Sequence, residues 1–174
     1  MSANPQIAEL VLANRLLTVM ASRVSENLAT FSSWLIGSFA GILALLIANL
    51  SDLSEVLPAK AVGTSASIFL IAVGLHVLQR YLAAIVAGGA IVTREAEALP
   101  TPAHLDFTVV FRQLERATFW PTSILVRRML ARVQAGDLAA GGRLYGKLAQ
   151  IQSYLVFGQL AFVVWAALKL AKTL

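Results

Sequence analysis

Three stretches of the chain lack charged residues over about the length that a helix needs to cross a membrane. They lie at 27–51, 61–79 and 148–168. A helix that rises 1.5 Å per residue needs roughly 20 residues to cross a hydrocarbon core of about 30 Å. Each stretch is close to that length or longer, so the pattern predicts three transmembrane helices in an all-α integral membrane protein.

The N-terminal segment 1–33 has a different pattern, in which apolar positions recur three, four or seven residues apart. These positions are Ile7, Leu10, Leu17, Val24, Leu28 and Phe31. The spacing predicts an N-terminal amphipathic helix that runs into the first span. Asn14 and Ala21 interrupt the apolar stripe, so it does not predict a regular coiled coil. The stripe either lies on the membrane or the rest of the protein, or forms a contact between copies of the chain.

Residues 94–147 hold eight basic and five acidic residues and three of the five prolines. Pro100 and Pro102 break the preceding helix, and Asp106 is placed to cap a helix over 107–119. The apolar residues of that helix share one face, namely Phe107, Val110, Phe111, Leu114 and Ala117. The segment is therefore predicted to be a helical region outside the bilayer.

The sequence Trp120-Pro121 ends this helix and begins the next one. In the second helix one side is apolar, with Leu125, Val126, Met129, Leu130 and Val133, and the other carries Arg127, Arg128, Arg132 and Gln134. Gly136 is predicted to terminate this helix and Asp137 to cap the last one, which runs over 138–172. The predicted parts of the chain are thus 1–33, 34–99, 100–147 and 148–174.

Lysine and arginine are distributed unequally around the three predicted spans. Two lie in the N-terminal tail and eight in 94–147, whereas one lies in 51–60 and two lie in the C-terminal tail. Basic residues are retained on the cytoplasmic side of membranes. The distribution predicts a protein of the bacterial inner (plasma) membrane with a cytoplasmic N-terminus and a periplasmic C-terminus.

Arg80 indicates where the second span ends, because the apolar run continues beyond this charged residue to Val92. A helix over 61–92 measures about 48 Å, which exceeds a core of about 30 Å. The span is therefore predicted to end near Gln79, with Arg80 extended to the headgroups and 82–92 in the cytoplasm. His76 lies one turn earlier on the same face. The alternative places His76 and Arg80 in an ion pathway, where histidine would act as a pH switch.

Small residues at four-residue spacing mark faces on which helices can approach closely in lipid. Gly37 and Gly41 form such a pair in the first span, and Ala84 and Gly88 form another after Arg80. The pattern predicts helix packing at these residues. It is equally consistent with a partner helix from the same chain and with one from another chain.

Composition supports a membrane protein and limits its chemistry. The chain is 58% hydrophobic and only 13% charged, and it contains no cysteine, which removes disulfides and thiolate chemistry. The net charge of +5 is attributed to basic residues near the membrane rather than to nucleic-acid binding. Contacts with anionic headgroups are predicted for five basic residues: Arg127, Arg128, Arg132, Lys169 and Lys172.

No motif indicates a catalytic, cofactor or metal site, and no enzyme activity is predicted. Two hypotheses follow for the function. The first is a homo-oligomeric pore or channel-like assembly, holin-like or of the membrane-disrupting effector type. The second is a non-catalytic accessory or scaffold subunit of a larger membrane complex.

Overall fold

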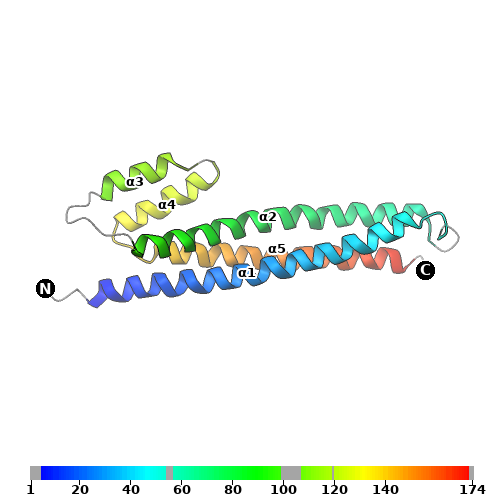
Figure 1. Ribbon diagram of the computed structural model, residues 1–174, viewed down its shortest axis with the longest axis horizontal. Coiled ribbons are helices and arrows are strands. Elements are labelled where there is room, and N and C mark those ends of the chain that lie inside the picture. The colour runs from blue at the N-terminus through cyan, green and yellow to red at the C-terminus, as the bar shows by residue number, and fades with distance from the viewer. Residues whose placement is uncertain (1–4, 54–56, 99–106, 119, 173–174) are drawn as a thin grey trace. The chain divides into compact units, whose positions relative to one another are not determined.

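The computed structural model describes residues 5–53, 57–98, 107–118 and 120–172, and all regular structure in them is helical (Figure 1). The helices are α1 Pro5–Ala48, α2 Ala59–Ala98, α3 Phe107–Arg116, α4 Thr122–Gln134 and α5 Ala140–Ala171. Three of them, α1, α2 and α5, are long and apolar enough to cross a membrane. The predicted all-α class with three helices of spanning length is confirmed.

The long helices extend well beyond the uncharged runs. Helix α1 has 44 residues and includes both the predicted amphipathic segment and the first span without a break. Helix α2 has 40 residues and continues through Arg80 and the apolar residues after it. It begins directly after Pro58, whose fixed φ suits the start of a helix.

The short helices follow the predicted punctuation with two corrections. Helix α3 ends at Arg116, so the helix predicted over 107–119 is too long. Helix α5 begins at Ala140, and Asp137 therefore does not cap it; the Asp137 carboxylate instead accepts a hydrogen bond from the Arg143 guanidinium. Gly136 follows α4 with φ of 91°, as expected of a terminating glycine. The residues predicted to separate α2 from α3, namely Pro100, Pro102 and Asp106, lie outside the described residues, as does His104.

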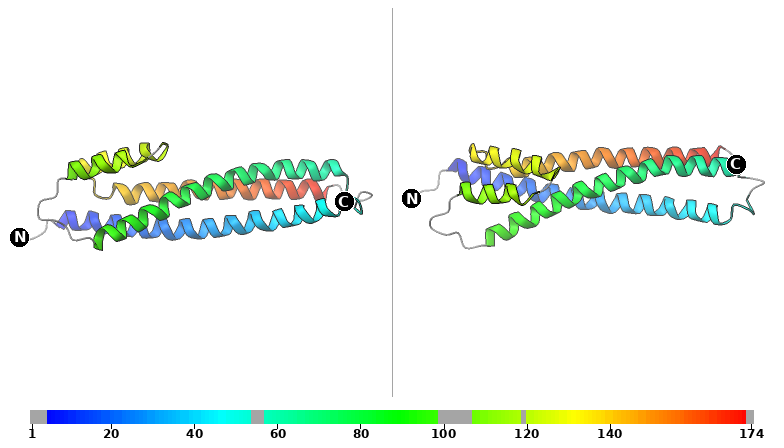
Figure 2. Two further views of the ribbon diagram at one scale, coloured as in Figure 1. Left: turned by 45° about the horizontal axis from the view of Figure 1, so that its top comes forward. Right: turned by 90° about the horizontal axis from the view of Figure 1, so that it is seen from above.

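The chain divides into two compact units. The bundle unit consists of Arg23–Ile85 and Leu148–Leu174, and the basic unit consists of Met1–Ser22 and Val86–Lys147. Within the bundle unit, parts of α1, α2 and α5 run side by side in alternating directions, as the views in Figures 1 and 2 agree.

Buried positions of the bundle unit alternate three and four residues apart, which is the spacing of coiled-coil packing. On α5 they are Gln152, Val156, Gln159, Val163, Ala166 and Leu170, and on α1 Ser25, Ser32 and Phe39 recur every seven residues. One half of this interior is apolar, and there Phe39 and Phe69 pack with ring centroids 5.1 Å apart. The other half is polar.

The apolar stripe predicted on the N-terminal segment does not form the buried face. Val24 and Phe31 are 45% and 44% exposed, whereas Ser25, Ala29 and Ser32 are buried. The rule that apolar residues face inward assumes water outside, but a helix in lipid gains little by hiding them. Small and polar residues therefore occupy the inner positions here.

Large apolar side chains cover the outside of the bundle unit. Trp34, Leu45, Leu70 and Phe157 are each about two-thirds exposed. A contiguous apolar surface of this kind is uncommon on proteins surrounded by water and marks contact with a membrane or a partner. The arrangement of side chains, and not only the length of the helices, favours a membrane location.

In the basic unit, the first turns of α5 pack closely on α1. The backbone N–H of Gly142 donates to the side-chain oxygen of Asn14 over 2.7 Å. A Cβ at position 142 would lie 2.7 Å from the Asn14 carbonyl oxygen and 2.8 Å from the Cβ of Leu17. Gly142 is thus required for this approach, and Asn14, which interrupts the predicted stripe, is a contact residue.

Helices α3 and α4 contact each other within the same unit. Helix α4 has the predicted two sides, since Leu130 is buried while Arg127, Arg128 and Arg132 are exposed. On α3, Val110 and Leu114 are 38% and 45% exposed, so part of its apolar side remains uncovered. The side chains of Phe107 and Phe111 lie outside the described part of the chain.

Candidate functional site

The polar half of the bundle interior contains three fully buried glutamines, Gln79 on α2 and Gln152 and Gln159 on α5. Heptad spacing places all three on the inner faces of their helices, because Gln152 and Gln159 are seven residues apart and Gln79 follows Ala72 by seven. Burying an amide costs free energy unless it is hydrogen-bonded. Each glutamine does have a partner, and the partners form two polar layers.

The first polar layer consists of Ser25, Gln79 and Gln152. The Ser25 hydroxyl donates to Gln152 Oε1 over 2.9 Å, and Gln79 Nε2 donates to the same oxygen over 3.4 Å. One side chain comes from each of the three helices. The layer therefore links α1, α2 and α5.

The second polar layer consists of Ser32, His76 and Gln159. The Ser32 hydroxyl donates to Gln159 Oε1 over 2.5 Å, and its oxygen lies 2.6 Å from His76 Nδ1. A serine hydroxyl has a single hydrogen, and here Gln159 receives it. With Gln159 Oε1 as the acceptor of that hydrogen, a neutral His76 donates from Nδ1 to the Ser32 oxygen, which corresponds to the Nδ1–H tautomer.

Three amide atoms in these layers are buried without a partner among the described residues: Gln79 Oε1, Gln152 Nε2 and Gln159 Nε2. Buried amide groups that lack a protein partner commonly bond to ordered water. These three atoms all belong to the polar half of the interior. His76 is its only titratable side chain among the residues that the structure describes, so proton exchange there would involve this imidazole.

The polar layers also explain the packing without any further role. Serine, glutamine and histidine side chains join helices across a membrane, and each contact contributes roughly 0.6 kcal/mol on average. Ser65 adds a similar contact, since its hydroxyl donates to the Ala166 carbonyl over 2.9 Å. Such bonds fix which residues of the helices face each other.

The two residues predicted to form either a pathway or an interface have different surroundings. His76 is partly buried and contacts Ser32 inside its own chain, whereas Arg80, one turn later, is exposed. The pathway and the interface remain alternative predictions for these two residues. The exposed Arg80 is compatible with extension to the headgroups.

The residues predicted for helix packing all lie on outer surfaces. Gly37 and Gly41 are exposed on α1, and a Cβ added at either would have no atom within 4 Å. In α2, Ala84 and Gly88 are likewise exposed, and Gly88 also has open space around it. These residues do not pack helices within the described part of one chain.

The residues predicted to meet headgroups are also exposed. Lys169 lies in the last turn of α5 and Lys172 directly follows that helix, while Arg127, Arg128 and Arg132 lie on α4. Sequence patterns did not predict the three glutamines as site residues, nor Arg143 and Lys147 on α5. The available signal was the seven-residue spacing of Gln152 and Gln159 within an uncharged run.

Comparison with protein-family models, with curated proteins and with solved structures finds no match for this chain. Among the described residues there is also no group of three histidine, aspartate or glutamate side chains that could hold a metal ion. The features that bear on function are therefore the geometry of the helices and their surfaces.

Proposed function

We propose that this chain is a three-span subunit of the bacterial inner membrane that assembles with copies of itself into a pore or channel-like structure. Its N-terminus and residues 94–147 lie in the cytoplasm and its C-terminus lies outside. The orientation is supported by the ten basic residues on one side of the spans against three on the other. The membrane location is supported by the apolar exterior of the bundle unit.

The observation that carries self-assembly is the open space around Gly37 and Gly41. Small residues in a spanning helix allow another helix to approach within van der Waals contact, and in lipid this contact drives association. The same helix exposes the hydroxyl residues Thr30 and Ser38. Both features favour a protein neighbour on α1 over lipid alone.

A conducting path would run between copies rather than through one bundle. The interior of the bundle unit is occupied by buried side chains, including Phe39, Ala72 and Val163. The exposed hydroxyl groups of α1 would line the path in a ring of subunits, as polar side chains line other pores.

The alternative function is that of a non-catalytic accessory subunit in a larger complex. The same glycine pair would then accept a helix of a different protein. The two functions differ in the composition of the particle, because a pore of this type contains copies of one chain only.

The test compares Gly41→Leu with Gly41→Ala. Both variants raise helix propensity, but only leucine fills the open space. The full chain is extracted in mild detergent, its mass is measured, and ion leakage is recorded from vesicles that contain it. We expect wild type and Gly41→Ala to form oligomers and to release ions, and Gly41→Leu to do neither. Ala161→Leu, at an exposed position of α5 among large residues, should behave as wild type.

A monomeric wild type that causes no leakage would overturn the pore. Oligomers without leakage would retain self-assembly and overturn the conducting path.

A further inference from the structure

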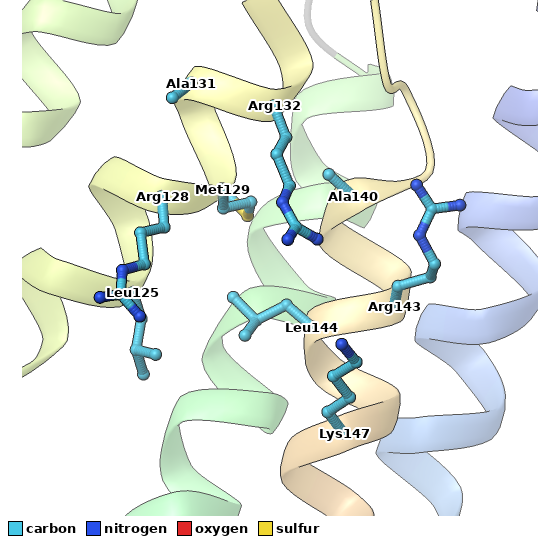
Figure 3. Close-up of a pocket in the computed structure, with 9 residues that line it drawn as sticks. All are labelled: Leu125, Arg128, Met129, Ala131, Arg132, Ala140, Arg143, Leu144 and Lys147. Atoms are coloured by element: carbon cyan, nitrogen blue, oxygen red, sulfur yellow. The ribbon is translucent and has the colours of Figure 1, made fainter. Parts of the chain in front are cut away.

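The basic unit contains a groove between α4 and the first turns of α5, with a volume of about 490 Å³. Small-molecule sites in proteins usually measure about 300–1,000 Å³. Four basic side chains line it, Arg128 and Arg132 from α4 and Arg143 and Lys147 from α5. In Figure 3, Arg132 and Lys147 extend from the two helices into the same space.

The charge of the groove is largely uncompensated. Asp137 pairs with Arg143. Within the described part of the chain, Arg128, Arg132 and Lys147 have no carboxylate partner. Bringing several like charges together is unfavourable unless an anion is bound among them. Guanidinium groups bind phosphate through two parallel hydrogen bonds, and a lysine adds a point charge.

The floor of the groove is apolar, formed by Leu125, Met129 and Leu144. Inorganic phosphate would make no use of this surface, whereas hydrocarbon attached to a phosphate would cover it. Lys147 also directly precedes the uncharged run 148–168 on the same continuous helix. Lys147 is thus the charged residue next to the predicted span, where basic side chains meet phospholipid headgroups.

We infer that this groove is a binding site for an anionic phospholipid, with the phosphate held by Arg128, Arg132 and Lys147 and the adjoining chain on the apolar floor. Arg143 also lines the groove and pairs with Asp137. The inference rests on the proposed membrane location but not on self-assembly. A monomeric protein that binds such a lipid would leave it intact.

The experiment uses the full chain in neutral detergent and three soluble probes, measured by thermophoresis. The probes are dihexanoyl phosphatidylglycerol, dihexanoyl phosphatidylcholine and inorganic phosphate. We expect phosphatidylglycerol to bind most tightly, because only this probe combines a net negative charge with acyl chains. Arg132→Gln and Lys147→Gln should each weaken its binding at least about tenfold, as expected for loss of one charge-assisted hydrogen bond.

Arg112→Gln is the control, because Arg112 is exposed on α3 in the same unit but does not line the groove. Its affinity should stay within about twofold of wild type. Leu144→Gln should weaken phosphatidylglycerol binding and leave phosphate binding unchanged. Circular dichroism verifies that each variant is helical. If a variant is not helical, Arg128→Gln is measured in its place.

Three results would overturn the inference. Equal weakening by Arg112→Gln would indicate a nonspecific charge effect. Equal affinity for inorganic phosphate would identify a free anion as the ligand. Equal affinity for phosphatidylcholine would show that the charge of the groove has no role.

Discussion

The side chain of Asn14 and the backbone of Gly142 are joined by a hydrogen bond of 2.7 Å, although 128 residues separate them in sequence. A methyl group at position 142 would collide with backbone and Cβ atoms of α1, which cannot move as a flexible side-chain end can. We therefore expect Gly142→Ala to destabilise the protein by about 1–3 kcal/mol, the usual cost of overpacking. Thermal unfolding in detergent measures this change.

Gly146 provides the control for that substitution. It lies one turn later on α5, and a Cβ there would meet no atom within 4 Å. Gly146→Ala should be neutral or stabilising by up to about 1 kcal/mol, because alanine has the higher helix propensity. Equal effects of the two substitutions would contradict the close approach at Gly142.

A second prediction concerns the tautomer of His76. With Gln159 Oε1 as the acceptor from the Ser32 hydroxyl, the proton of the neutral imidazole lies on Nδ1. The side-chain amide of asparagine can place an N–H near the position of the imidazole Nδ1. The longer side chain of glutamine places its amide near the position of Nε2. His76→Asn should therefore retain more stability than His76→Gln. Nitrogen chemical shifts of the labelled imidazole give an independent measurement, and a protonated Nε2 in the neutral form would contradict the assignment.

The third prediction tests Arg80 as the end of the second span. Arg80→Lys keeps a long stem and a charge at this exposed position, so it should have little effect. Arg80→Leu would leave 61–92 without a charge and let α2 slide deeper into the bilayer. Because the chain has no cysteine, Ala84→Cys is a unique label. An impermeant maleimide added on the cytoplasmic side should label this cysteine when it is combined with Arg80→Lys. When it is combined with Arg80→Leu, labelling should be much weaker. Equal labelling would contradict the role of Arg80.

The fourth prediction tests the orientation. Reporter fusions after residue 55 and after Leu174 should be active in the periplasm, and a fusion within 103–135 should be active in the cytoplasm. A C-terminal reporter that is active only in the cytoplasm would overturn the arrangement of the three spans.

The long helices could be predicted from the sequence because a helix that crosses lipid needs a continuous apolar run of about 20 residues. Such a run can be recognised within one segment of the chain. The interior of the bundle could not be predicted in the same way. An apolar residue such as Phe31 faces outward and Ser32 faces inward, so hydrophobicity does not distinguish the two sides of α1. The useful signal was the recurrence of Ser25 with Ser32 and of Gln152 with Gln159, seven residues apart. Without the fold, nothing indicates that these pairs lie on facing helices.

The groove shows a second limit of sequence reasoning. Arg128 and Arg132 were expected to contact phosphate because both lie on the charged side of α4. Arg143 and Lys147 belong to the next helix, and only the turn at Gly136 brings them to the same space. The direction taken by a chain after a glycine with positive φ depends on tertiary packing, which local patterns do not contain.

Because Ser25 and Ser32 have the same seven-residue spacing as Gln152 and Gln159, an alternative register of α5 would keep part of the polar packing. Moving α5 by seven residues, about 10.5 Å along its axis, would bring Gln152 beside Ser32 and keep one serine–glutamine pair. Gln159 would then enter the apolar half at the level of Phe39, and the bond from Ser65 to the Ala166 carbonyl would be lost. A register shift of one heptad therefore keeps half of the serine–glutamine pairing, and both the amide of Gln159 beside Phe39 and the lost bond of Ser65 count against it.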